Sequence, residues 1–437
     1  MRSAPGNGTT GPGAGPSGET PSERERGRYG PGIYVHFPFC VQRCGYCDFF
    51  VVLGGDDARE AYVEQLLREI DLAARSQDPR FDFSDATFQT LFFGGGTPSL
   101  LTPLQMETIL TRLRSRFRFA EDAEITVECN PESATADRLR AYRELGVNRV
   151  SFGVQSLDRE ELRLLDRAHG AGDAARRMDD ARRAGFSAVS LDLIYGLPGT
   201  AASTSGTPTE AEMRWLRTLE SALALQPDHL SAYLLGLEPH VPLARKLKRG
   251  QVAELPGDED SAAQYDTLRA RTSANGLVQY EISNFARPGE ESRHNQNYWL
   301  CGDYLGLGPS AHSHRRGVRW SNVKSLPGYR DALAKSVRPF DTEEVLDPQQ
   351  RAEEWIFLGL RRTEGVPLPL ITEWWGEGAV ERLQAVPALE KWLEFDQPLA
   401  PGESRVRLAP EALFVSNTVF AECCEALGPV RGRGLVK

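Results

Sequence analysis

The chain has 437 residues, of which 40% are hydrophobic, enough to bury a large core and to form more than one domain. Its 51 basic and 61 acidic residues give a net charge of −10, which argues against a sequence-independent binder of nucleic-acid phosphates. No apolar run is long enough for a membrane span, and the N-terminus lacks the basic-then-apolar order of a secretory signal. We therefore expect a cytoplasmic protein with no nucleic-acid partner.

The first 28 residues are rich in Gly, Pro, Ser and Thr and end in a charged run at 23–26. A segment of this composition cannot bury enough apolar surface to fold. Residues 1–28 are therefore predicted to be a disordered, dispensable tail.

Residues 29–275 repeat a simple rhythm, in which a short apolar run ends in a turn and a helical stretch follows. The apolar runs are 33–37, 88–93, 124–128, 149–154, 188–194 and 229–235. The helical stretches are 60–75, 103–117, 135–145, 160–167, 174–184 and 210–225. This alternation predicts an α/β protein with a parallel sheet. Since no Gly-x-Gly-x-x-Gly follows the first strand, a partial (β/α)6 barrel is favoured over a dinucleotide-binding sheet.

The rest of the chain departs from this rhythm. Residues 201–208 are small and polar and indicate a flexible surface loop, with a substrate-gating lid as the alternative. Residues 276–335 are expected to be a connecting segment. Residues 336–437 are expected to form a small C-terminal α+β domain, winged-helix-like in order, although the acidic charge argues against nucleic acid. Its predicted elements are helices at 349–363 and 368–375, short strands at 405–408 and 413–415, and a final helix from Asn417.

Three of the seven cysteines, Cys40, Cys44 and Cys47, stand within eight residues directly after the first predicted strand. An odd count with one dense cluster does not suit a disulfide framework, whereas thiolates are good ligands for iron–sulfur clusters or zinc. Three thiolates on a [4Fe–4S] cubane leave one iron open, and open metal positions are where chemistry occurs. The alternatives are a structural zinc site with His36 as fourth ligand, or three unrelated buried thiols.

A Cx3Cx2C loop after a first strand resembles the radical S-adenosylmethionine superfamily. The resemblance implies that the amino and carboxylate groups of S-adenosylmethionine occupy the open iron, and that electron transfer yields a 5′-deoxyadenosyl radical. Such a cofactor needs acceptors for its amine, a cation for its carboxylate and polar partners for its ribose, all just beyond the strand ends. Candidates follow successive predicted strands: the run 94–98, Glu128, Gln155 and Asp192, with Arg167 after the fourth strand's helix.

Together these motifs resemble the oxygen-independent coproporphyrinogen III oxidase family and its close relatives, the HemW family of haem chaperones. The resemblance runs from about Gly32 to the C-terminus, apart from the 201–208 stretch. It implies that Cys40, Cys44 and Cys47 hold the cluster. It also implies a set of S-adenosylmethionine contacts: Tyr34, Tyr46, Gly95, Gly96, Thr97, Glu128, Gln155, Arg167, Asp192 and, as a weaker match, Gly236.

Three features place the chain with the chaperones rather than the oxidases. Phe49 stands where the oxidases usually have a fourth cysteine. The chaperones' HNxxYW motif is present from His294 to Trp299. The low-complexity tail has no counterpart of the structured N-terminal extension of the oxidases.

The HNxxYW stretch also suits haem chemically. A neutral imidazole binds haem iron and aromatic rings lie against a porphyrin, so His294 is a candidate haem ligand beside Tyr298 and Trp299. The alternative is that His294 belongs to a polar structural pair and Trp299 to the core. His312 and His314 are further candidates, with structural roles expected.

The resemblance implies a protein that binds haem and delivers it to an acceptor, such as a membrane-bound haem enzyme, and that needs a reductant for its cluster. No catalytic residue is assigned. One alternative is the oxidase reaction, in which coproporphyrinogen III is decarboxylated to protoporphyrinogen IX. The other is an electron-transfer or structural iron–sulfur protein, which leaves Gln155, Arg167 and Asp192 unexplained.

Overall fold

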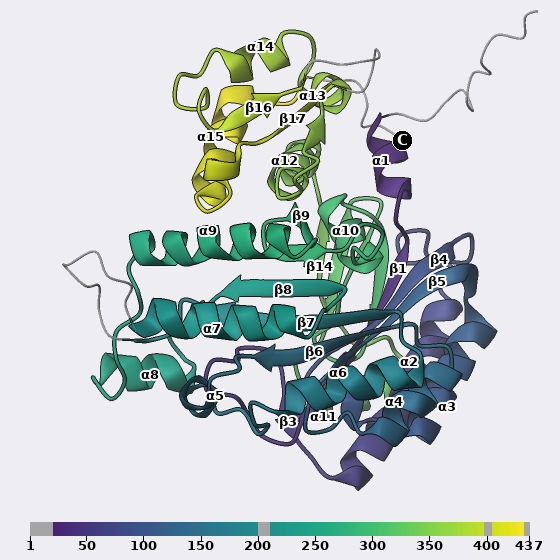
Figure 1. Cartoon of the computed structure of the whole chain (residues 1–437). Coiled ribbons are helices and arrows are strands. Elements are labelled where there is room, and N and C mark those ends of the chain that lie inside the picture. The colour runs from purple at the N-terminus through teal and green to yellow at the C-terminus, as the bar shows by residue number, and fades with distance from the viewer. Residues whose placement is uncertain (1–20, 200–209, 397–403, 432–437) are drawn as a thin grey trace, which may run out of the picture.

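The computed structural model describes residues 21–199, 210–396 and 404–431. Six parallel strands lie side by side in chain order and form the open barrel predicted from the sequence (Figure 1). These strands are β1 (Gly32–Phe37), β4 (Thr87–Gly95), β5 (Arg118–Cys129), β6 (Arg149–Gln155), β7 (Ala188–Tyr195) and β8 (His229–Leu234). The predicted loop at 201–208 lies outside the described residues.

Helices connect these strands and cover the outer face of the sheet (Figure 1). They are α2 (Asp56–Ala74), α3 (Pro103–Arg116), α4 (Ala136–Glu144), α5 (Arg159–Leu164), α6 (Asp173–Ala184) and α7 (Glu210–Ala224), and each matches a predicted helix. Local signals set their starts: Thr102 and Gln105 form a capping box at α3, and Thr135 caps α4. In β1, Ile33, Val35 and Phe37 join the core, and the alternate residue Tyr34 faces the inside of the barrel.

The segment 276–335, expected as a connector, extends the main sheet at both edges. Strands β10 (Asn284–Ala286) and β9 (Val278–Glu281) add to β8 after helices α8 (Pro242–Lys248) and α9 (Asp258–Ala274). Strand β11 (Tyr304–Leu307) returns beside β1, and β12 (His312–Arg315) and β13 (Val318–Asn322) follow it. Strand β14 (Phe340–Val345) pairs with β13, so the main sheet includes residues that were predicted to belong to the C-terminal domain at 336–437. Helices α10 (Arg293–Trp299) and α11 (Leu326–Ala334) belong to the same region. The described sheet thus has twelve strands.

The C-terminal domain carries a separate sheet in the order β15-β17-β16 above the barrel (Figure 1). Its elements are α12 (Pro348–Gly359), β15 (Val366–Pro367), α13 (Leu368–Trp375), α14 (Ala379–Gln384), β16 (Leu393–Phe395), β17 (Arg405–Leu408), η2 (Pro410–Ala412) and α15 (Ser416–Leu427). The two predicted helices, the strand at 405–408 and the final helix are present, and β15, α14 and β16 were not predicted. The predicted strand at 413–415 is wrong: Pro410 begins a 3₁₀ turn, and the buried Leu413 leads directly into α15.

The predicted disordered tail is also wrong in part. Residues 1–20 lie outside the described range, but α1 (Pro21–Gly27) is helical and lies against the C-terminal domain (Figure 1). Glu25 accepts a hydrogen bond from Arg405 at 2.8 Å, and Arg28 pairs with Glu364 at 2.8 Å. These partners are hundreds of residues away in sequence, so composition alone could not reveal them. Within the described ranges, every helix is too short or too polar to cross a membrane.

Candidate cluster and cofactor site

A cavity of about 550 Å³ opens where the barrel strands end. Its wall includes every residue predicted to contact the cluster or S-adenosylmethionine: Cys40, Cys44, Cys47, Tyr34, Tyr46, Gly95, Gly96, Thr97, Glu128, Gln155, Arg167, Asp192 and Gly236. Carboxyl ends of neighbouring parallel strands meet at one edge, which is why residues so far apart in sequence converge here.

The cysteine loop lies at one end of this cavity and is tied to the barrel by the backbone. Strands β2 (Phe39–Cys40) and β3 (Val52–Leu53) pair across its base, and Gly45 bonds through its backbone with Leu165 and Leu243. The Thr97 hydroxyl donates to Cys40 Sγ at 3.4 Å, and Arg167 donates to Cys44 Sγ at 3.5 Å. Donors of this kind favour a thiolate ligand. None of the seven cysteines, all of which lie in the described ranges, forms a disulfide.

The zinc alternative loses its proposed fourth ligand. Both ring nitrogens of His36 are in hydrogen bonds, Nδ1 with the Tyr34 hydroxyl at 3.1 Å and Nε2 with the Phe50 carbonyl oxygen at 3.0 Å. Within the described ranges, no three His, Cys, Asp or Glu side chains converge on a position suited to a single metal ion. A cubane cluster places each thiolate on a different iron, so its thiols need not converge on one point.

The glycines after β4 keep the backbone within reach of a ligand. Gly95 has φ +106°, which favours glycine. A Cβ on Gly96 would lie 2.7 Å from the carbonyl oxygen of Phe39 and 2.9 Å from that of Phe37. The tight packing around Gly96 therefore leaves no space for a side chain. Gly236 differs, because a Cβ there would meet nothing within 4 Å.

Two partly buried carboxyl groups line the cavity, one of them directly beside the glycines. Glu128 accepts a hydrogen bond from the Gly95 N–H at 3.2 Å, and burial together with the nearby Asp192 raises the pKa of Glu128 to about 8. Asp192 accepts from the Ser151 hydroxyl at 2.9 Å, and burial raises its pKa to about 6. Such groups exchange between donating and accepting hydrogen bonds near neutral pH, which suits recognition of sugar hydroxyls.

Arg167 supplies a partly buried cation between the cysteine loop and the strand ends. Its Nη2 donates to the Gly153 carbonyl oxygen at 2.5 Å and to Asn130 Oδ1 at 2.7 Å. Its Nε is buried and has no hydrogen-bond partner in the described chain. An unpaired buried donor is costly, so this position fits an anionic group such as the carboxylate of S-adenosylmethionine.

Two residues in this site were not singled out from the sequence. Asn130 donates from Nδ2 to Thr97 Oγ1 at 3.1 Å and accepts from Arg167, so it connects two predicted contacts. Ser151 holds Asp192. Their positions in the sequence could have indicated both residues. Asn130 directly follows the end of β5. Ser151 lies on β6, where it is paired with Glu128 of β5 and with Ser190 of β7.

The structure favours the structural alternative for His294. Its ring is buried, stacks on Phe92 at 5.0 Å, and uses both nitrogens in hydrogen bonds, with Thr90 Oγ1 at 2.7 Å and the Tyr298 hydroxyl at 2.8 Å. Burial lowers the pKa of His294 to about 3, so the ring is neutral. In this arrangement neither nitrogen is free to bind iron.

The other two candidate histidines lie in different surroundings. His314 is buried, with Nδ1 bonded to the Gly302 carbonyl oxygen at 3.1 Å and Nε2 accepting from the Gly317 N–H at 3.2 Å, which is a structural role. His312 is exposed and lines a second cavity between the barrel and the C-terminal domain.

A parallel open barrel with a three-cysteine loop and polar groups at its strand ends defines a radical S-adenosylmethionine protein. Consistent with this, the profile described as "Radical SAM superfamily" matches residues 34–204.

Similar proteins of known name place the chain in one family within this superfamily. The heme chaperone HemW of Mycobacterium tuberculosis is 39% identical over 81% of this chain and 86% of its own length. The heme chaperone HemW of Bacillus subtilis is 34% identical over 89% of this chain and 97% of its own length. A bovine protein named radical S-adenosyl methionine domain-containing protein 1, mitochondrial, is 38% identical over 76% of this chain and 74% of its own length. The chain belongs to the HemW family of heme chaperones.

One solved structure extends the fold comparison over nearly the whole chain. The coproporphyrinogen III oxidase HemN of Escherichia coli superposes with a TM-score of 0.73 at 24% identity and covers 92% of each chain. At this identity the match concerns the fold, which the two proteins share.

Proposed function

We propose that this chain binds haem and delivers it to a haem-accepting protein, and that it carries a [4Fe–4S] cluster with S-adenosylmethionine in the strand-end cavity. The observation that carries the proposal is the convergence of all the predicted contact residues on that one cavity. The haem part is supported by relatives that match most of this chain and are named heme chaperones. The proposal includes an acceptor such as a membrane-bound haem enzyme, an external reductant for the cluster and a cytoplasmic location.

Each part of the cavity has a role in this proposal. Cys40, Cys44 and Cys47 would hold the cluster, and Arg167 would face the carboxylate of S-adenosylmethionine. The backbone at 95–97 would meet its amine, and Glu128 with Asp192 would meet polar groups of the nucleoside. When bound, the cluster and S-adenosylmethionine supply one-electron radical chemistry.

The oxidase reaction is the second candidate, because the fold is shared with HemN over most of the chain. Phe49 weighs against it. This residue occupies the position of the oxidases' usual fourth cysteine, is 64% exposed, and carries no ligating atom.

The test uses anaerobically purified full-length protein with a reconstituted cluster. Haem and coproporphyrinogen III are titrated separately in the presence of S-adenosylmethionine. We expect a haem Soret shift, transfer of that haem to an added apo-haem protein, and no porphyrinogen turnover. Formation of protoporphyrinogen that is abolished in Cys44→Ser would contradict the proposal and establish the oxidase instead.

A further inference from the structure

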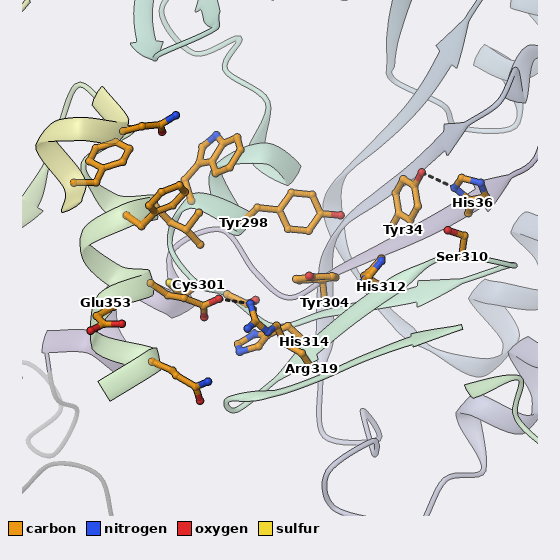
Figure 2. Close-up of a pocket in the computed structure, with 18 of the residues that line it drawn as sticks. Tyr34, His36, Tyr298, Cys301, Tyr304, Ser310, His312, His314, Arg319 and Glu353 are labelled. Atoms are coloured by element: carbon orange, nitrogen blue, oxygen red, sulfur yellow. Dashed lines mark hydrogen bonds and ion pairs between the residues drawn. The ribbon is translucent and has the colours of Figure 1, made fainter. Parts of the chain in front are cut away.

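A second cavity, of about 1180 Å³, lies between the barrel and the C-terminal domain (Figure 2). One wall comes from β1 and the β11–β13 region, where Tyr34, Tyr304 and His312 lie, and the other from helices α12 and α15. Pockets for drug-sized ligands usually measure about 300–1,000 Å³. This cavity is therefore large enough for a bulky planar ligand.

Several aromatic rings line this cavity. Phe49 is 64% exposed and Phe357 is 44% exposed, and both face the cavity. Trp299, Tyr298 and Phe420 add further rings. Large exposed apolar side chains clustered around a cavity indicate a binding site, because an apolar ligand that covers them removes their surface from water, which is favourable.

Three histidines line the cavity, and they differ in the freedom of their ring nitrogens. His36 and His314 each have both nitrogens in hydrogen bonds. His312 is exposed and, within the described chain, its ring makes no hydrogen bond. An imidazole whose ring nitrogens are free of hydrogen bonds can bind a metal.

The charges around the cavity are uneven. Lys324 is exposed and has no ion pair in the described part of the chain, whereas Arg319 is paired with Glu344 and Glu354. Glu353 and Glu354 line the helical side of the cavity. A ligand with carboxylates would therefore direct them toward Lys324 and away from α12.

We propose that this second cavity holds the haem, with His312 as the ligand to the iron, the aromatic rings against the macrocycle, and Lys324 toward a propionate. The inference rests on the proposed haem-binding function and assigns the haem to this cavity. Tyr34, Asp48, Phe49 and Tyr298 line both cavities, so the haem would lie directly beside the cluster loop.

Thiolate ligation is the competing chemistry, since Cys301 and Cys424 also line the cavity. Burial raises the pKa of Cys424 to about 11 and that of Cys301 further still. A metal must displace a proton from either thiol before it can bind there, whereas the His312 imidazole can offer a ring nitrogen that makes no hydrogen bond in the described chain.

The test is a haem titration of full-length protein with its cluster intact, followed by absorption and EPR spectroscopy. The variants are His312→Ala, His294→Gln, Lys324→Ala and the control His240→Ala, whose histidine is exposed and lines neither cavity. We expect His312→Ala to weaken haem binding by about tenfold or more and to change the Soret position. Added imidazole should restore the spectrum of His312→Ala. Lys324→Ala should weaken binding less, and His294→Gln and His240→Ala should bind as the original chain does.

The outcomes separate the two proposals. If the original chain binds haem and His312→Ala binds it equally well with the same spectrum, the place assigned here is wrong while the haem function stands. If only His294→Gln loses haem binding, with a normal cluster content and circular dichroism spectrum, the ligand to the haem iron would be His294 of the HNxxYW motif and not His312. If the original chain binds no haem, the proposed function itself fails.

Discussion

At the scale of single residues, the role of each residue depends on the space around it and on whether its polar atoms are already hydrogen-bonded. Gly96 and Gly236 are both predicted cofactor contacts, Gly236 as the weaker match, and of the two only Gly96 is enclosed by carbonyl oxygens. His294 and His312 were both haem candidates, yet only His312 has free ring nitrogens in the described chain. Residue identity suggested the chemistry, and only the tertiary contacts separate the roles.

A first prediction follows from the two glycines. Gly96→Ala should lower the free energy of unfolding by about 1–3 kcal/mol, because the new Cβ meets backbone atoms that cannot move aside. Gly236→Ala, which lines the same cavity, should change it by less than about 0.5 kcal/mol. Chemical denaturation of the two variants side by side measures the difference. Equal losses in both would show that the backbone around Gly96 adapts.

A second prediction concerns pH. The folded-state pKa of His294 is about 3, below the unfolded value of 6.5, so between these values the unfolded state binds more protons. Stability is therefore full above pH 6.5 and falls as the pH drops, by about 2 kcal/mol at pH 5 from this group. His36, with a pKa of about 4, adds to the loss. His294→Gln should show a smaller decrease in the free energy of unfolding from pH 7 to pH 5, and an unchanged decrease would contradict the buried neutral ring.

At the scale of elements, the chain joins segments that are distant in sequence. Strand β11 lies parallel to β1, and α1 is held by the C-terminal domain. Glu25 contacts Arg405 at 2.8 Å and the buried Arg362 at 3.8 Å. These contacts make residues 21–28 part of the folded structure rather than of the tail.

A third prediction tests that attachment. Glu25→Ala removes a partner from two largely buried arginines and should cost about 1–3 kcal/mol of stability. Asp137→Ala is the matched control, because its pair with Arg140 is exposed and should contribute less than about 0.5 kcal/mol. Thermal denaturation of both variants makes the comparison. A Glu25→Ala protein as stable as the control would mean that α1 does not stabilise the C-terminal domain.

At the scale of the whole molecule, the half-barrel was predictable and its extensions were not. The six parallel strands follow from local apolar runs separated by helical stretches. The rule that strand ends converge predicts that Glu128, Arg167 and Asp192 lie in one cavity, as they do. The added strands of 276–335 and the cavity under the C-terminal domain depend on contacts across hundreds of residues. Residues 413–415 were mistaken for a strand because apolar residues suit a buried turn equally well.

The molecule has two neighbouring cavities that differ in the chemistry of their linings. The strand-end cavity gathers three thiols, a partly buried cation and two carboxyl groups. The larger cavity beside it carries several aromatic rings and the His312 imidazole, whose nitrogens make no hydrogen bond in the described chain. A shared wall that includes Phe49 and Tyr298 separates them. A movement of these shared residues at the cluster would therefore change the wall that contacts a ligand in the second cavity.

The central claim is that the strand-end cavity holds a cluster with an iron open to S-adenosylmethionine. EPR spectroscopy of the reduced, reconstituted protein, recorded with and without S-adenosylmethionine, tests it most directly. We predict a [4Fe–4S] signal that changes when S-adenosylmethionine is added and that is absent in Cys44→Ser. A normal [4Fe–4S] signal that S-adenosylmethionine leaves unchanged would contradict the claim.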